Sequence, residues 1–322
     1  MPAAALRVAV VQAGSVLFDT PASLAKLRRL AAEAAGEGAR LAVFPEAFLG
    51  GYPKGVDFGA RVGSRSPEGR DWFRRYYEAA IDVPGPAAEA LAEVARETGL
   101  HLVVGAIERE GGTLYCSALF VSPAAGLLGK HRKLVPTAME RLVWGAGDGS
   151  TMPVLATPVG RLGAAICWEN YMPLFRTAMY AQGVELYCAP TVDDREGWVA
   201  TMRHVALEGR CFVLSACQHL LRRDCPPDYE PIQGGAPETE LIRGGSLVVG
   251  PLGQVLAGPV YGREAVLVAD LDLGDIARGK FDLDVVGHYA RPDVFRLHVD
   301  RSPKPAVTFG PGGPDGGRGG AT

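Results

Sequence analysis

The order in which strand-like and helix-like segments follow one another constrains the fold of this chain most. Apolar segments alternate with helical ones in residues 6–104 and again in residues 154–216, whereas strand-like segments follow one another directly between and after these parts. Strands are expected at residues 6–12, 40–45, 100–108, 113–121, 126–130, 154–157, 162–167, 184–189, 212–216, 245–249 and 265–270. Helices are expected at residues 21–36, 70–80, 86–98, 173–182 and 198–209. This order predicts an α/β layered domain with a mixed sheet.

A single domain is expected to account for most of the 322 residues. No linker rich in proline or serine divides the chain, so we place the domain at residues 1–302. Residues 303–322 are rich in glycine and proline with few apolar side chains, and we expect this tail to be disordered. The formal net charge of -3 gives no reason to expect nucleic acid or an anionic membrane as a partner.

The cysteines and the hydropathy pattern indicate a cellular compartment. No signal peptide is visible at the N-terminus, and no apolar segment approaches the roughly 20 residues needed to cross a bilayer. We therefore expect a cytosolic protein whose six cysteines are reduced. They are Cys116, Cys167, Cys188, Cys211, Cys217 and Cys225. No two of them form a C-x-x-C pair, so a structural zinc site is not expected.

One cysteine lies at a corner between two predicted elements. The apolar residues Leu162, Ala164 and Ile166 predict a short buried strand that runs up to Cys167. Pro173 suits the first turn of a helix, because its missing N–H would have no partner there. The thiol of Cys167 is thus expected where a strand ends and a helix is about to begin, close to unpaired backbone N–H groups.

Glu46, Lys133 and Cys167 each follow an apolar strand, where open α/β sheets place their ligand sites. A carboxylate can take the proton of a thiol, and an ammonium can balance charge that develops on the attacked atom. Taken singly, each residue has a structural interpretation: a small buried side chain for Cys167, a cap or ion pair for Glu46, and a solvated charge for Lys133. Their combination predicts a thiol nucleophile with a base and a cation beside it.

The segments Phe44-Pro45-Glu46, His131-Arg132-Lys133 and Cys167-Trp168-Glu169-Asn170, in this order and spacing, resemble the nitrilase superfamily of carbon–nitrogen hydrolases. The resemblance covers residues 6–296. It implies a four-layer α-β-β-α sandwich and a catalytic triad made by Glu46, Lys133 and Cys167. Glu140 matches a second glutamate of the family, which helps to hold the lysine and to orient the substrate.

Other segments resemble the nitrilase branch of that superfamily. They are residues 48–53 (Phe-Leu-Gly-Gly-Tyr-Pro), 133–141, 144–149 (Trp-Gly-Ala-Gly-Asp-Gly), 167–174 and 190–194 (Pro-Thr-Val-Asp-Asp), followed by Trp198 and Met202-Arg203-His204. The resemblance implies hydrolysis of an organic nitrile to the carboxylic acid and ammonia, through a cysteine thioimidate and thioester. No metal or organic cofactor is needed for that reaction. We expect Tyr52, Trp168 and Thr191 to line the substrate pocket.

The sequence leaves several alternatives open. An amidase or a cyanide-degrading hydrolase would use the same triad, and a non-catalytic scaffold on this fold would be expected to lack one of its members. Trp168 is equally well explained as core packing, His204 is expected at the surface or an interface, and Asp193-Asp194 is interpreted as a turn. The helices that start near Pro173 and Trp198 are expected, by resemblance, to form the contact of a homodimer or higher homo-oligomer.

Overall fold

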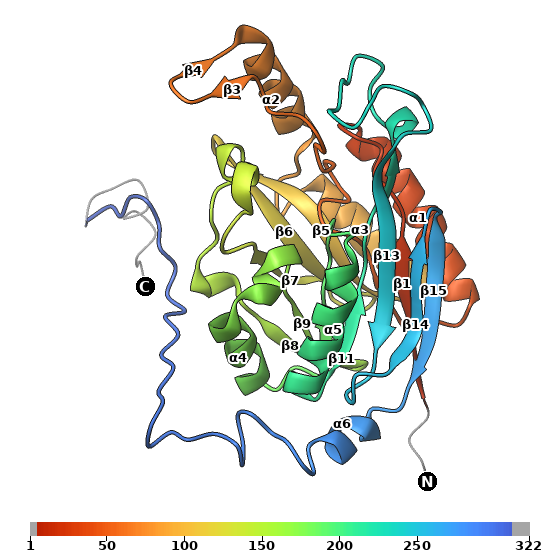
Figure 1. Ribbon diagram of the computed structural model, residues 1–322, viewed down its shortest axis with the longest axis vertical. Helices are drawn as coiled ribbons and strands as arrows, with labels where there is room; N and C mark the ends of the chain where they lie inside the picture. The colour runs from red at the N-terminus through yellow and green to blue at the C-terminus, as the bar shows by residue number, and fades with distance from the viewer. Residues whose placement is uncertain (1–4, 311–322) are drawn as a thin grey trace, which may run out of the picture.

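The computed structural model describes residues 5–310 and contains two large mixed sheets that pack face to face (Figure 1). The strands of the first sheet lie in the order β15 (Ala265–Leu271), β1 (Leu6–Gln12), β2 (Leu41–Val43), β5 (His101–Glu110), β6 (Thr113–Ser122) and β7 (Gly126–Arg132). Those of the second lie in the order β12 (His219–Leu221), β13 (Glu240–Val249), β11 (Phe212–Ser215), β10 (Leu186–Cys188), β9 (Gly160–Ala164) and β8 (Val154–Thr157), and β14 (Val255–Tyr261) pairs with β13. The mixed sheet expected from the sequence pattern is therefore divided into two.

Helices cover the outer faces of both sheets. They are α1 (Thr20–Gly36) and α3 (Pro86–Thr98) on the first sheet, and α4 (Pro173–Ala181) and α5 (Glu196–Gly209) on the second. At one end of the molecule, α2 (Pro67–Ala79) stands beside the small hairpin of β3 (Ala60–Arg61) and β4 (Ser64–Arg65), and α6 (Gly274–Gly279) follows β15. Short 3-10 turns are η1 (Ala138–Leu142), η2 (Gly149–Thr151), η3 (Cys167–Tyr171) and η4 (Arg222–Asp224).

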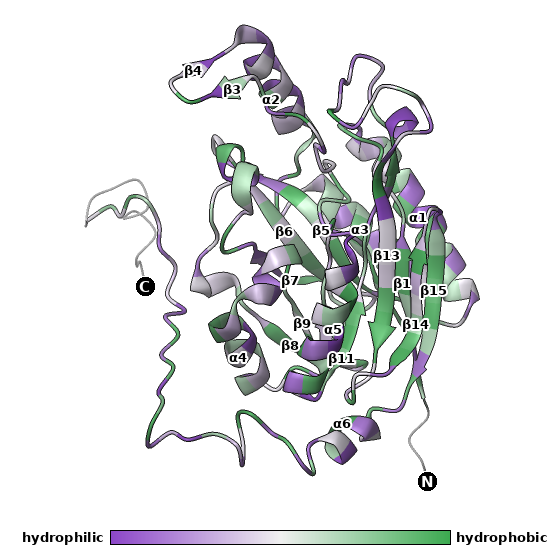
Figure 2. Ribbon diagram, in the orientation of Figure 1, coloured by the Kyte–Doolittle hydropathy of each residue, from purple (hydrophilic) through white to green (hydrophobic). Residues whose placement is uncertain are grey.

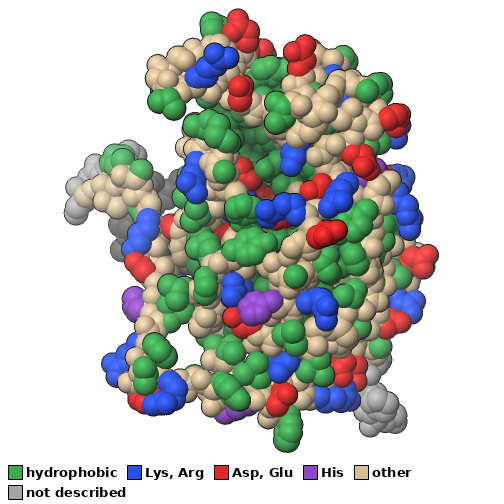
Figure 3. All heavy atoms as spheres, in the orientation of Figure 1, with side chains coloured by type: hydrophobic (Ala, Val, Ile, Leu, Met, Phe, Trp, Pro, Cys, Tyr) green, Lys and Arg blue, Asp and Glu red, His purple; other side chains and the backbone are tan. Residues whose placement is uncertain are grey.

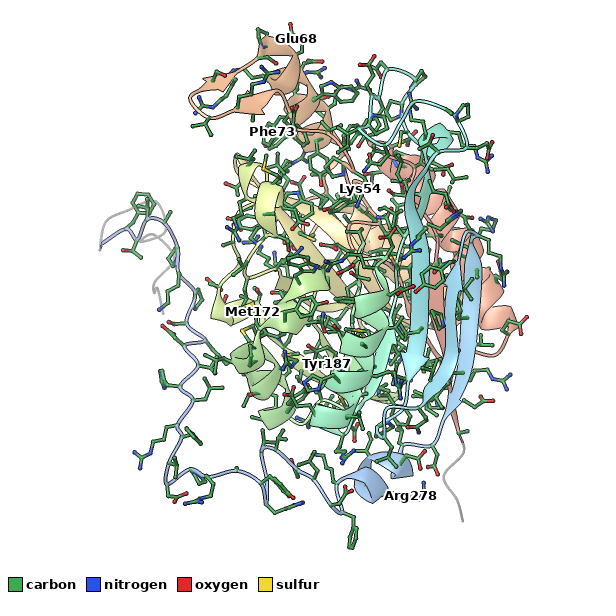
Figure 4. All side chains as sticks on the ribbon, in the orientation of Figure 1. Lys54, Glu68, Phe73, Met172, Tyr187 and Arg278 are labelled. Carbon is green, nitrogen blue, oxygen red and sulfur yellow. The ribbon has the colours of Figure 1, made fainter. Side chains whose placement is uncertain are left out.

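Alternate residues of β1 face different cores, which explains the layers. Val8 and Val10 pack between the two sheets, whereas Ala9 and Val11 pack under α1 and α3. A third core lies between the second sheet and α4 and α5, where Tyr187 of β10 is buried (Figure 4). The strands accordingly carry mostly hydrophobic residues, and hydrophilic residues gather on the exposed surfaces of the helices (Figure 2). The three cores join the layers in the order α-β-β-α, and each buried Val or Leu side chain in them stabilises the fold by about 1.5–3 kcal/mol.

Helix boundaries follow local capping chemistry. The Asp19 carboxylate accepts a hydrogen bond from the amide of Ala22 (2.9 Å), and Pro21 occupies the first turn of α1. Gly99 ends α3 with a left-handed backbone (φ 73°), which glycine adopts without steric cost. Each of the five expected helices is present, with boundaries that differ by a few residues.

The Cys167 corner and four of the strands differ from the sequence-based expectation. The strand before the Cys167 corner ends at Ala164, and the 3-10 turn η3 separates it from α4. The thiol therefore lies one tight turn before the helix and not directly at its first residue. The expected strands do not include β3, β4, β12 or β14. The residues of β14 are largely exposed, and Gly258 and Pro259 interrupt its apolar pattern.

Beyond α6 the chain runs along the outside of the molecule without helix or strand (Figure 1). The described part of the expected tail, residues 303–310, is exposed, and residues 311–322 lie outside the described residues. On the face drawn in Figure 3, cationic and anionic side chains are interspersed, in line with the small net charge. None of the helices between residues 5 and 310 combines the length and the apolar content that a bilayer crossing requires.

Candidate active site

Glu46 lies in a bulge between two points at which the chain pairs with β5. The amides of Phe44 and Leu49 donate to carbonyls of β5 (2.8 and 3.1 Å), and the residues between them arch over Gly105. The side chain of Gln218 donates to the carbonyl oxygen of Glu46 (2.8 Å). The Glu46 carboxylate is fully buried. The backbone contacts on both sides of Glu46 and at its carbonyl oxygen therefore determine where this carboxylate lies.

Lys133 follows directly after β7 and reaches into the interior. Its amide continues the pairing with β6 by donating to the carbonyl of Cys116 (2.8 Å). Its Nζ donates to Oε1 of Glu46 (2.7 Å) and to Oε2 of Glu140 (2.8 Å). The ammonium, which is fully buried, thus joins two carboxylates that are 94 positions apart in the sequence.

Cys167 occupies a sharp elbow at the start of η3. Its φ of 49° is left-handed, a strained conformation that non-glycine residues adopt mainly where the surroundings hold them. Two hydrogen bonds hold the backbone here: the Cys167 amide donates to the carbonyl of Pro190 (2.9 Å), and Asn170 donates to the carbonyl of Cys167 (2.8 Å). The hydroxyl of Thr191 contacts Sγ at 3.3 Å. The elbow turns the thiol out of the strand direction and toward a cavity.

Glu140, in η1, is held at both of its oxygens. The Tyr52 hydroxyl donates to Oε1 (2.9 Å), and the amide of Thr137 donates to Oε2 (2.6 Å), beside the Lys133 ammonium. Three donors thus surround the Glu140 carboxylate and fix its orientation beside Lys133.

Burial and neighbouring charges set the protonation of the group. Burial raises the pKa of Glu46 to about 7, with the attraction of Lys133 opposing and the charge of Glu140 adding to the rise. Burial also raises the pKa of the Cys167 thiol, and the Glu46 charge raises it further. Burial opposes the charge of Lys133, but the nearby carboxylates outweigh it and hold the pKa of Lys133 well above its ordinary value. At neutral pH the thiol is therefore protonated and the lysine is charged, so the thiol needs a base to react.

The two oxygens of Glu46 have different surroundings. Oε1 accepts from Lys133 and from the thiol of Cys116, whose Sγ lies 3.6 Å away. Oε2 is buried and has no hydrogen-bond partner among residues 5–310. A buried acceptor without a partner is costly in a folded protein, and it is the oxygen available to take up a proton.

A cavity of about 170 Å³ opens onto the thiol. Its lining residues are Tyr52, Lys54, Thr137, Glu140, Cys167, Trp168, Val192, Asp193, Asp194 and Arg195. Trp168 forms one wall: its Nε1 donates to Asp193 (2.9 Å), and the Arg195 guanidinium lies 4.8 Å from the ring centroid. A second cavity of about 130 Å³ shares Tyr52, Lys54 and Glu140 with the first. Lys54 lies below the α2 segment in Figure 4.

The structure brings the four residues expected to be catalytic close to the same cavity. The three residues expected to line the substrate pocket do not all lie in its wall. Glu46, Lys133 and Glu140 form one hydrogen-bonded chain, and Cys167 lines the cavity with Glu140. Tyr52 and Trp168 also line the cavity, whereas Thr191 lies behind the thiol and contacts its sulfur.

Other polar groups near the site were not singled out from the sequence. Cys116, in β6, and Gln218, between β11 and β12, contact Glu46, and no local sequence pattern marks such contacts. Asp193 accepts hydrogen bonds from Trp168 and Arg195 and lines the cavity. His204 is exposed on α5, as expected. Within the described part of the chain, no three His, Cys, Asp or Glu side chains converge in a way that could hold a metal ion.

The chain was compared with protein families and with known proteins. The sequence model of the carbon-nitrogen hydrolase family matches residues 7–281. A nitrilase of Bradyrhizobium diazoefficiens is 61% identical over 302 residues, which cover 94% of each chain. An aliphatic nitrilase of Sinorhizobium fredii is 60% identical over 301 residues, covering 94% of this chain and 97% of that protein.

A solved structure supports the architecture. A mutant of an amidase of the nitrilase superfamily from Nesterenkonia AN1 superposes with a TM-score of 0.63, covering 87% of this chain and 95% of the amidase. The two sequences are only 23% identical, so this likeness bears on the fold alone. It agrees with the α-β-β-α sandwich expected from the sequence.

Proposed function

The chain belongs to the carbon-nitrogen hydrolase family, and we infer that it is a nitrilase, which hydrolyses an organic nitrile to the carboxylic acid and ammonia. The observation that carries the chemistry is the buried group in which Lys133 joins Glu46 and Glu140 beside the cavity that exposes Cys167. This group supplies a base, a cation and a nucleophile, the three parts that addition to a carbon–nitrogen triple bond needs.

In the first half of the reaction, the Cys167 sulfur adds to the nitrile carbon. Glu46 takes the thiol proton as the bond forms, since the thiol itself is neutral and Oε2 is free to accept. Negative charge develops on the nitrile nitrogen, where the Lys133 ammonium stabilises it. Glu46 then passes the proton that it took from the thiol to that nitrogen, which completes a neutral thioimidate and leaves the Glu46 carboxylate ionised again. We assign the backbone N–H of Trp168, next to the thiol, as a further donor to the developing charge.

In the second half, water replaces nitrogen. Glu46 accepts a proton from a water molecule while the oxygen of that water adds to the thioimidate carbon. The tetrahedral adduct then expels ammonia and leaves a thioester. A second water molecule, activated in the same way, releases the carboxylic acid and returns the proton to the Cys167 sulfur. One nitrile and two water molecules thus give one acid and one ammonia. Glu140 keeps Lys133 oriented through both halves.

The cavity suggests where the rest of the substrate lies. We propose that Tyr52 and Trp168 contact the organic group of the nitrile, because both line the cavity that exposes the thiol. Thr191 acts on the nucleophile instead, through its 3.3 Å contact with Sγ. No cofactor enters this scheme, because each proton and charge is handled by a side chain.

We also propose that the protein forms a homodimer or a higher homo-oligomer through α4 and α5. Tyr171, at the end of η3, and Leu174, in the first turn of α4, are 43% and 67% exposed, and large hydrophobic side chains this exposed fit a buried interface better than free solution. Size-exclusion chromatography coupled to light scattering checks this. A monomer at every concentration tested contradicts it.

Cys167→Ala tests the function directly. We expect this variant to release no ammonia from nitriles while unfolding at a temperature close to that of the wild type. Cys211→Ala is the matched control, because Cys211 is equally buried but lies in the core under α5, away from the cavity. Nitrile turnover by Cys167→Ala, or equal loss in both variants, contradicts the assignment.

A substrate panel separates the related activities that share these residues. The wild-type protein is assayed for ammonia release from nitriles, amides and cyanide, and the acid-to-amide ratio of the products is measured by chromatography. A nitrilase gives acid and ammonia from nitriles. Turnover of amides alone identifies an amidase, and turnover of cyanide alone identifies a cyanide-degrading enzyme.

A further inference from the structure

We propose that His131 and Glu169 form a positioning pair that holds the backbone beside Lys133 at a fixed distance from the backbone beside Cys167, a role that rests on the proposed nitrilase function. Both side chains are completely buried, and neither takes part in the reaction scheme. They are the only fully buried histidine–carboxylate ion pair among the described residues.

Glu169 joins two parts of the chain that carry reacting groups. Its Oε1 accepts the amide of Leu134 (2.6 Å), the residue directly after Lys133. Its Oε2 accepts the amide of Ile166 (2.7 Å), the residue directly before Cys167, and also faces Nε2 of His131 (2.8 Å). One carboxylate thus ties together the two backbones from which the ammonium and the thiol extend.

The fold gives a reason for such a tie. Lys133 follows β7 at the edge of the first sheet, and Cys167 follows β9 in the second. Strand pairing fixes positions within each sheet but sets no register between the two, which meet through apolar packing. The Glu169 carboxylate adds directional hydrogen bonds across that layer at the point where the two reacting groups meet.

His131 completes the pair as an imidazolium. Its Nδ1 lies 2.6 Å from the carbonyl oxygen of Thr151, which can only accept, so Nδ1 carries a proton. Its Nε2 faces a carboxylate oxygen, so it donates as well. Burial alone would lower the pKa of His131, but the Glu169 charge and these hydrogen bonds outweigh it and raise that pKa. The cation lies against the Glu169 carboxylate, whose two oxygens accept hydrogen bonds from His131 and from the amides of Leu134 and Ile166.

Glu169→Gln tests the proposal, because the amide has the same shape but replaces one accepting oxygen with a donor that must face a backbone N–H. A shift of about 1 Å between reacting groups reduces turnover by about 100-fold, so we expect kcat per active site to fall by that factor. The KM is expected to change by less than about threefold, because the cavity wall is not altered. A role in folding alone would lower the amount of folded enzyme but not its kcat per site.

Glu108→Gln is the matched control. Glu108 is as buried as Glu169 and also has three donors, Ser117, Lys130 and Arg132, but all three are side chains, so it does not accept from a backbone amide next to Lys133 or Cys167. We expect this variant to lose comparable thermal stability while its kcat per site stays within about threefold of the wild type. Equal kcat per site in the two variants overturns the proposal.

His131→Gln keeps the test valid if Glu169→Gln does not fold, since glutamine can still donate to Glu169 but carries no charge. We expect a smaller loss of kcat per site, about tenfold, with KM unchanged. An unchanged kcat per site overturns the proposal. The rate at which iodoacetamide alkylates Cys167, expected to fall in both pair variants but not in Glu108→Gln, gives a readout that does not depend on nitrile turnover. If the wild type hydrolyses no nitrile, the proposed function fails, and the alkylation rates still decide whether the pair positions the thiol.

Discussion

Gly105→Ala offers a sharp test of how the fold positions Glu46. Gly105 lies in β5 under the bulge that carries Glu46. A methyl group built on it would lie 2.1 Å from the carbonyl oxygen of Pro45 and 2.6 Å from Cα of Glu46. Its φ is not in the left-handed region, so alanine suits the backbone and only the missing space matters.

The size of the effect follows from that overlap. Bringing the carbon–oxygen distance from 2.1 Å to even 3.0 Å requires the bulge to move by about 0.9 Å. Overpacking of this kind destabilises a protein by about 1–3 kcal/mol. Since Glu46 moves with the bulge, and a misplacement near 1 Å reduces turnover by about 100-fold, we expect the activation free energy to rise by about 2.7 kcal/mol.

The assay compares kcat for ammonia release with the temperature of unfolding. Gly129→Ala is the control, because it lies in β7 of the same sheet and its added methyl would meet nothing closer than a Leu155 methyl at 3.7 Å. This control is expected to keep kcat within about twofold of the wild type. Near-wild-type kcat in Gly105→Ala, with folded protein, would refute the claim that this contact positions Glu46.

Three further predictions concern the buried charges. In the proposed mechanism Glu46 must be ionised to act as the base, and its pKa is raised to about 7. We therefore expect kcat/KM to fall about tenfold per pH unit below pH 7. A pH–rate profile whose acidic limb lies near pH 4.5 would contradict this. Lys133→Arg should reduce kcat by at least about 100-fold in the same ammonia assay. The Lys133 Nζ lies 2.7 Å from Glu46 and 2.8 Å from Glu140, and a planar guanidinium does not fit between these two carboxylates. Activity above a tenth of wild type contradicts the role of Lys133. Tyr52→Phe removes a donor to the Glu140 carboxylate, and kcat measured by steady-state kinetics should fall about tenfold. An unchanged kcat argues against Glu140 as an orienting group.

Much of the fold could be predicted because local pattern and tertiary environment agree. β1 is apolar on both faces, and both faces are buried, so its central place in a sheet follows from its residues alone. The division of the strands between two sheets could not be predicted from local pattern, because strand pairing depends on contacts distant in the sequence. Only the family resemblance indicated the sandwich. β14 could not be predicted because its side chains remain largely exposed.

The candidate site divides in the same way. Glu46, Lys133 and Cys167 follow apolar segments, and a chemical argument could combine them from the residue types and their positions alone. The supporting contacts are different in kind. Nothing near Gly105 in the sequence indicates that the backbone of Glu46 crosses it, and nothing near Glu169 indicates that its carboxylate reaches the residue after Lys133. Such contacts depend on how the bulge and the two sheets meet.

The raised pKa of the Cys167 thiol also bears on how long the enzyme survives in an oxidising cell. Peroxides attack the thiolate and not the neutral thiol, and susceptibility also follows exposure. The Cys167 thiol has a raised pKa and is only 3% exposed, so in the proposed mechanism its sulfur becomes strongly nucleophilic only while Glu46 withdraws the proton in the presence of a nitrile. We therefore expect the idle protein to resist conversion of this thiol to sulfenic and sulfinic acids.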